Sequence, residues 1–127
     1  MHVYAVRIYY EDTDHSGVVY HANYLKYFER AREHLLGPEE LVRLLREQGV
    51  GFVVYKAALT YRAGATFGDV VEIRTTPRLV SDYRVAFTQN AHRQSDGELL
   101  VEGELDLVCV DDTKQLVKLP ESVTGQL

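Results

Sequence analysis

The fold is decided by the segment NYLKYFERAREHLL at positions 23–36. Its apolar side chains recur at the spacing of one helix face, at Tyr24, Tyr27, Phe28, Ala31 and Leu35. Asn23 is the expected N-cap, and Gly37-Pro38 is the expected stop. The segment therefore predicts one long amphipathic helix, whose apolar face needs a surface to pack against.

Strand patterns flank this helix on both sides. Residues 3–10 are β-branched and aromatic, which favours a first strand before the helix. A shorter helix is expected at 39–47, ending at Gly49. Beyond Gly51 apolar and polar residues alternate, with a hairpin signal at Asp96-Gly97. The alternation predicts four strands, at 53–61, 69–79, 83–92 and 99–107.

These elements predict an α+β architecture. One long helix cannot cover both faces of a sheet, and regular alternation is typical of a sheet with one covered face. A five-stranded antiparallel sheet wrapped around the helix buries both apolar surfaces. We expect residues 1–127 to form a single domain, with the sheet edges and the open face available for dimerisation.

The composition narrows the class of protein. The chain has 127 residues with 46% apolar and 26% charged residues, and 19 acidic against 14 basic side chains. A net charge of -5 argues against nucleic acid as the main partner. No apolar run is long enough for a membrane span, and the N-terminus lacks a signal-peptide pattern, so we expect a soluble cytoplasmic protein. The single cysteine, Cys109, lies in an apolar run and is expected to be a buried, inert thiol.

Candidate chemistry is concentrated in the segment YYEDTDHSGVVYHANY at 9–24, which leads directly into the helix. A helix start presents unpaired N–H groups and a partial positive charge that can stabilise an oxyanion. A nearby carboxylate can act as general base or nucleophile. Asp14 is the candidate for that role, and His21 is the candidate for contacting a carbonyl. Tyr10 is a third catalytic candidate, and Asn23 and Tyr24 are candidates for the oxyanion-binding helix start.

Each of these residues also has a structural interpretation. Asp14 could be a turn carboxylate, His21 a packed or capping imidazole, and Tyr10 a strand residue. The spacing of Asp12, Asp14 and Ser16 resembles half of an EF-hand loop, but position twelve is Asn23 rather than glutamate. A zinc site from Asp14, His15 and His21 lacks the helical i, i+4 histidine pair. We therefore expect no metal site.

The same segment resembles a known family. The runs YYEDTD at 9–14, GVVYHANYL at 17–25 and FERAR at 28–32 closely resemble hot-dog-fold acyl-CoA thioesterases of the 4-hydroxybenzoyl-CoA thioesterase-like family. The nearest type is the bacterial Tol–Pal-associated acyl-CoA thioesterase. The similarity continues at 52–54, 87–89 and 108–111, and it therefore covers nearly the whole chain.

The resemblance implies a hot-dog fold and hydrolysis of an acyl-CoA to a free acid and coenzyme A, with no cofactor. Asp14 falls on the catalytic acid of the family, His21 on the active-site histidine of the Tol–Pal-associated type, and Tyr10 on a tyrosine implicated at such sites. It also implies a homodimer or homotetramer with active sites at the subunit interface. Envelope or phospholipid-synthesis proteins are possible partners.

Several alternatives stay open at this point. A hot-dog dehydratase or hydratase also acts on acyl thioesters, and a non-catalytic acyl-CoA-binding or scaffold module would keep the fold. The phosphates of coenzyme A need a local cationic patch. The candidates for that patch are Lys56, Arg62, Arg84, Arg93 and Lys114. The candidates for lining an acyl pocket are Tyr55, Leu59 and Tyr61.

Overall fold

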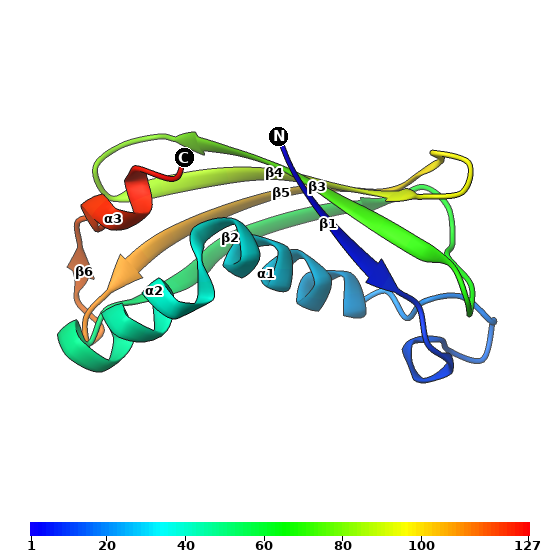
Figure 1. Ribbon diagram of the computed structural model, residues 1–127, viewed down its shortest axis with the longest axis horizontal. Helices are drawn as coiled ribbons and strands as arrows, with labels where there is room; N and C mark the ends of the chain where they lie inside the picture. Colours follow the sequence, from blue (N-terminus) through cyan, green and yellow to red (C-terminus); the bar gives the residue numbers. More distant parts are fainter.

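The computed structural model describes residues 1–127 and has a curved antiparallel sheet that wraps around one long helix, α1 (Asn23–Leu36). Figure 1 shows α1 lying along the concave face of the sheet, whose other face carries no helix of comparable length. The five long strands are β1 (His2–Arg7), β2 (Gly51–Tyr61), β3 (Val70–Leu79), β4 (Arg84–Arg93) and β5 (Leu99–Val110). The expected α+β hot-dog architecture is confirmed.

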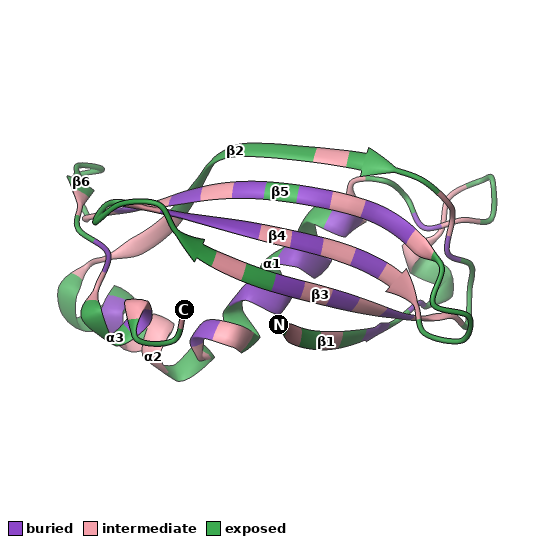
Figure 2. Ribbon diagram, turned by 90° about the horizontal axis from the view of Figure 1, so that it is seen from above, coloured by how far each residue is buried: buried purple, intermediate pink, exposed green.

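The strand order is β1-β3-β4-β5-β2, and every pairing is antiparallel. β2 therefore pairs with the last long strand, β5, and not with β3, which follows it in the chain. The chain crosses the sheet between Tyr61 and Val70, so β1 and β2 become the two edges. Figure 2 shows β2 as a mostly exposed strand at one edge, while β4 and β5 alternate between buried and less buried residues.

The core lies between α1 and the concave face of the sheet. The buried face of α1 carries Tyr24, Tyr27, Phe28, Ala31 and Leu36, and it belongs to the same hydrophobic cluster as the inward residues of β3, β4 and β5. Contact is close at Gly103 of β5. A Cβ atom there would lie 2.7 Å from Phe28 Cε2 and 2.8 Å from the Gln89 carbonyl oxygen. Glycine at this position lets the helix approach the sheet.

Two local predictions from the sequence are wrong. β1 ends at Arg7, so Tyr10 does not continue the strand but begins a short 3-10 helix, η1 (Tyr10–Asp12). The Tyr9 N–H donates to Asp12 Oδ2 at 2.7 Å, which stabilises this turn. Asn23 is the first helical residue and not the N-cap, a position that Ala22 takes. The Asn23 side-chain amide instead donates to the Asp12 carbonyl at 2.9 Å.

The segment between α1 and β2 is helical, as expected, but it is divided. α2 (Pro38–Arg43) continues into a π-helical turn, η2 (Leu44–Gln48), and Gly49 ends it in the left-handed conformation. Two short elements complete the chain: β6 (Leu116–Val117) pairs with β5, and α3 (Glu121–Thr124) follows. None of the helices combines the length and the apolar character needed to cross a membrane.

Candidate active site

The loop from η1 to α1 is fixed by its own backbone. The Asp14 N–H donates to the Val18 carbonyl at 2.9 Å, and the Gly17 N–H donates to the Asp14 carbonyl at 3.0 Å. The Asp12 carbonyl accepts from the Tyr20 N–H at 2.9 Å as well as from the Asn23 side chain. These bonds attach the loop to the N-terminal end of α1, where Figure 1 shows it.

Asp14 is half-buried, and only one of its carboxylate oxygens is hydrogen-bonded within the protein. The Ser16 N–H donates to Oδ1 at 2.9 Å, an Asx turn that orients the side chain. No protein group donates to Oδ2. The turn interpretation and the catalytic one are therefore compatible, because the turn fixes one oxygen and leaves the other available to react.

The start of α1 offers several backbone donors. The N–H groups of His21 and Ala22 donate to no protein acceptor, and the Tyr24 N–H reaches the His21 carbonyl only at 3.4 Å. Together with the partial positive charge of a helix start, these groups can polarise a carbonyl oxygen. The His21 ring is exposed and lies against Tyr20, with ring centroids 4.5 Å apart. Its ring nitrogens make no hydrogen bond within the protein.

One pocket brings the carboxylate and the helix start together. It has a volume of about 340 Å³, and Asp14, His21 and Tyr24 line it. Its remaining lining comes from Val18, Val19, Tyr61, Arg62, Ala63 and Gly64. Tyr24 is buried, which raises the pKa of its hydroxyl to about 12 and keeps it protonated at neutral pH. Three of the sequence-predicted site residues thus share one cavity.

The other wall of this pocket comes from the end of β2 and the segment after it. The Tyr61 hydroxyl donates to the His21 carbonyl at 3.0 Å, and the Val19 N–H donates to the Ala65 carbonyl at 2.9 Å. Gly64 allows the two segments to meet, because a Cβ atom there would lie 2.6 Å from Val18 Cγ1. The sequence indicated Tyr61 only as a candidate for lining an acyl pocket, and it did not identify Gly64 as a residue of this site. The role of Gly64 is evident only from its close approach to Val18 in the folded chain.

Other candidates lie elsewhere or are already engaged. Tyr10 does not line the pocket; it is 77% exposed, and its ring stands edge-on to Phe67.

The Arg93 guanidinium is held by Asp69, Asp96, Glu98 and the Gly64 carbonyl. Arg84 donates to the Tyr55 hydroxyl at 2.6 Å. Arg62 lines the pocket and pairs with Glu102 on the surface at 3.0 Å. No three His, Cys, Asp or Glu side chains cluster as metal ligands.

Comparison with known proteins places the chain in a family. Residues 8–127 match the family model of the thioesterase-like superfamily. The chain is 39% identical over 123 residues to the acyl-CoA thioester hydrolase YbgC of Escherichia coli O157:H7, covering 95% of this chain and 91% of that protein. It is 38% identical over 110 residues to the acyl-CoA thioesterase YbgC of Haemophilus influenzae, covering 85% of this chain and 79% of that one.

The fold is shared with solved thioesterases. The crystal structure of Slr0204, a 1,4-dihydroxy-2-naphthoyl-CoA thioesterase from Synechocystis, superposes with a TM-score of 0.91. The overlap covers 98% of this chain and 93% of that one at 23% identity, a similarity that concerns the fold alone. From the family match and the two sequence relatives together, the chain belongs to the thioesterase-like superfamily.

Proposed function

We propose that the chain is an acyl-CoA thioesterase whose reaction takes place in the pocket lined by Asp14, His21 and Tyr24. The observation that carries the proposal is that two groups line one cavity. One is a carboxylate with a free oxygen, and the other is a helix start with free N–H groups. These are the parts that thioester hydrolysis requires: a base or nucleophile and an oxyanion stabiliser. The two relatives named for acyl-CoA hydrolysis support the assignment.

The proposed reaction begins with the thioester carbonyl oxygen at the N–H groups that open α1. Asp14 either removes a proton from water, which attacks the carbonyl carbon, or attacks it directly to give a mixed anhydride that water then cleaves. The carbon–sulfur bond breaks, and the products are a free acid and coenzyme A. His21 contacts the carbonyl or the leaving sulfur through its free ring nitrogens. Coenzyme A enters as part of the substrate, and the mechanism requires no cofactor.

Arg62 is the cation we favour for a phosphate of coenzyme A, because it lines the same pocket. Its partner Glu102 is exposed, so exchanging that ion pair for a phosphate costs little. Arg93 is less suited, since three carboxylates already surround it. A contribution of Tyr10 to the site remains a prediction from the resemblance.

We infer a homodimer that forms through β2. This edge strand has 11 residues against six in β1, and it exposes apolar side chains, including Val53, Val54 and Tyr55. A long apolar edge with unpaired backbone groups favours pairing with a second copy. Assembly into a homotetramer, a cytoplasmic location and envelope or phospholipid-synthesis partners remain predictions from the sequence.

A thiol-release assay tests the activity. Purified protein is given a panel of acyl-CoAs, with a thiol reagent present to detect free coenzyme A. Cys109 is buried and its thiol pKa is raised to about 12, so the protein itself contributes little signal. We expect release by the parent protein and a loss of roughly a hundredfold or more in kcat for Asp14→Asn. Asp112→Asn, an exposed carboxyl in the turn after β5, is the matched control and should retain activity.

Three outcomes would overturn the proposal. Undiminished release by Asp14→Asn would refute the site. Hydration of an enoyl-CoA without thiol release would favour the dehydratase or hydratase alternative, and binding of acyl-CoA without any turnover would favour a scaffold.

A further inference from the structure

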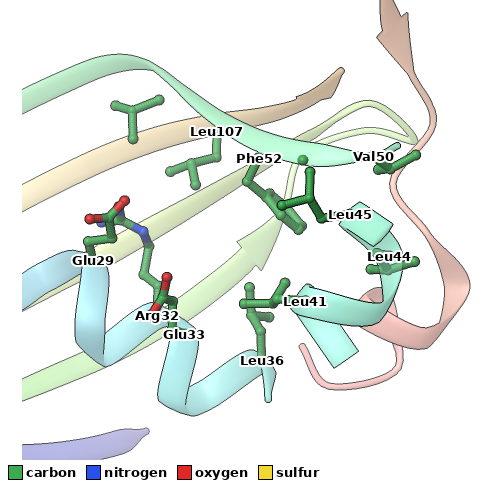
Figure 3. Close-up of a pocket in the computed structure, with 12 residues that line it drawn as sticks. Glu29, Arg32, Glu33, Leu36, Leu41, Leu44, Leu45, Val50, Phe52 and Leu107 are labelled. Atoms are coloured by element: carbon green, nitrogen blue, oxygen red, sulfur yellow. The ribbon is translucent and has the colours of Figure 1, made fainter. Parts of the chain in front are cut away.

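A second cavity lies at the opposite end of α1 from the Asp14 pocket. It has a volume of about 380 Å³ and lies between the C-terminal half of α1, the α2–η2 segment and the start of β2 (Figure 3). Most of its lining is apolar and includes Leu36, Leu41, Leu44, Phe52, Val54 and Leu107. We call it the Arg32 pocket, because one buried cation lines it among these apolar side chains.

Arg32 is only 5% exposed, yet it has few partners. Its Nη1 donates to Gln89 Oε1 at 2.9 Å, and it forms no ion pair. Its Nε and Nη2 make no hydrogen bond within the protein, and Arg32 lines the cavity. A buried guanidinium with unused donors is costly unless an acceptor reaches it. The Arg32 pocket is therefore incomplete without one.

The charges around Arg32 restrict what that acceptor can be. Glu29 and Glu33 line the same pocket one turn before and one residue after Arg32, and both are exposed (Figure 3). Burial lowers the pKa of Arg32, and the two carboxylates partly oppose that shift. A carboxylate ligand would be repelled by both glutamates, while a plain alkyl group would leave the guanidinium unpaired. A hydroxyl group suits the site, since it can accept from Arg32 and donate to a carboxylate.

In the β2 dimer inferred above, two-fold symmetry would bring this pocket to the active site of the other subunit. The Arg32 pocket adjoins the start of β2, at Gly51 and Phe52, and the Asp14 pocket adjoins its end, at Tyr61. Within one chain, ten residue steps of about 3.3 Å separate the two ends of the strand. Antiparallel pairing of β2 with a second β2 places the start of one strand beside the end of the other.

We propose that the Arg32 pocket receives the acyl tail of a thioester bound at Asp14 of the partner subunit, and that Arg32 selects tails carrying a hydroxyl group. The proposal rests on the proposed thioesterase activity and on the β2 dimer. It assigns Arg32 as a specificity-determining residue that contacts the distal end of the substrate. The thioester itself remains at the carboxylate and helix start described above.

Three probes of equal chain length test the selection: hexanoyl-CoA, 6-hydroxyhexanoyl-CoA and adipoyl-CoA. They differ only in a methyl, hydroxyl or carboxylate terminus. We expect kcat/KM of the dimeric parent protein to favour the hydroxylated probe over both others by about tenfold, the scale of one hydrogen bond to a charged group. Arg32→Met should bring the ratio between the hydroxylated probe and hexanoyl-CoA close to one. Arg32→Lys should restore part of that ratio.

Arg30→Met is the matched control, because Arg30 is exposed on the same helix and does not line the pocket. It should leave the ratio as in the parent. Equal kcat/KM for all three probes in the parent would overturn the proposal without any variant. So would an Arg32→Met variant that lowers all three values by the same factor, which is the result of a purely structural role. If the parent releases no thiol from any acyl-CoA, the proposed function itself fails.

Discussion

The Tyr61 hydroxyl donates a 3.0 Å hydrogen bond to the backbone carbonyl of His21. This bond joins the last residue of β2 to the loop that opens α1. The same carbonyl is the distant acceptor, at 3.4 Å, of the Tyr24 N–H. Tyr61 thus holds the His21 carbonyl in a position where the Tyr24 N–H is only weakly engaged. That donor therefore stays available for the carbonyl of a substrate.

Tyr61→Phe should accordingly lower kcat while the protein stays folded. The ring would keep its packing near Tyr24 and His21, but the His21 carbonyl would be free to turn toward the Tyr24 N–H. We expect a loss of about tenfold in kcat, corresponding to about 1.4 kcal/mol of transition-state stabilisation. Steady-state kinetics with a good acyl-CoA substrate measures it. Tyr55→Phe is the control, because the Tyr55 hydroxyl bonds Arg84 and Asp106 away from this pocket. An equal loss in both variants would contradict the argument.

The long helix was predictable because its signal is local. The apolar spacing located α1, and the Gly37-Pro38 stop gave its end at Leu36, while its start lies one residue earlier than an N-cap at Asn23 implied. The bounds of β3, β4 and the start of β5 were likewise predicted to within one residue. The N-cap was not predictable in this way. Asn23 has the right chemistry, but its side chain reaches the Asp12 carbonyl, a contact that depends on how the preceding loop folds back.

Long-range pairing limited what the sequence could predict about the site. Asp14, His21 and Tyr24 lie within eleven positions of one another, and they do share a pocket. Gly64 and Ala63 reach the same pocket only because β2 pairs with β5 at the far edge of the sheet. Nothing in the local pattern specifies that pairing. The Arg32 pocket was missed for a similar reason, since Gln89 lies 57 positions from its partner.

Gly103→Ala should destabilise the fold strongly. The added methyl would lie 2.7 Å from Phe28 Cε2 and 2.8 Å from the Gln89 carbonyl, so the helix and the sheet would have to separate locally. Overpacking of this kind costs about 1–3 kcal/mol. Urea denaturation followed by circular dichroism measures the free energy of unfolding. Gly51→Ala in β2 serves as control, because its Cβ would meet no atom within 4 Å. A stable Gly103→Ala variant would show that the helix does not sit this close to β5.

Val54→Lys should separate the proposed dimer. Val54 is 41% exposed on β2, and a pair of lysines near the two-fold axis would bury charge in an apolar interface. The expected result is a halving of the mass measured by light scattering at the same protein concentration. Val3→Lys tests the opposite edge of the sheet, because Val3 is 46% exposed on β1. If Val3→Lys dissociates the assembly and Val54→Lys does not, the dimer forms through β1.

Stability should fall at alkaline pH, and Cys109 should set where the fall begins. Burial raises the pKa of the Cys109 thiol from 9.0 to about 12 and that of the Tyr24 hydroxyl from 10.0 to about 12. Between these values the unfolded chain has lost protons that the folded chain keeps. The free energy of unfolding therefore decreases as pH rises from about 9 to 12, by up to about 1.4 kcal/mol per pH step for each such group, and it is unaffected by them below pH 9.

Cys109→Ala separates the two contributions. It should lower stability at pH 7 through the lost packing, but its free energy of unfolding should decline less steeply than that of the parent between pH 9 and 10. Above pH 10 the difference in slope should persist, because the folded Cys109 thiol keeps its proton until about pH 12 and Tyr24 adds the same slope to both proteins. Urea midpoints measured at half-unit intervals from pH 8 to 11 give both slopes. Parallel curves across the whole range would mean that the Cys109 thiol is as easily ionised in the folded protein as in the unfolded chain, which its complete burial opposes.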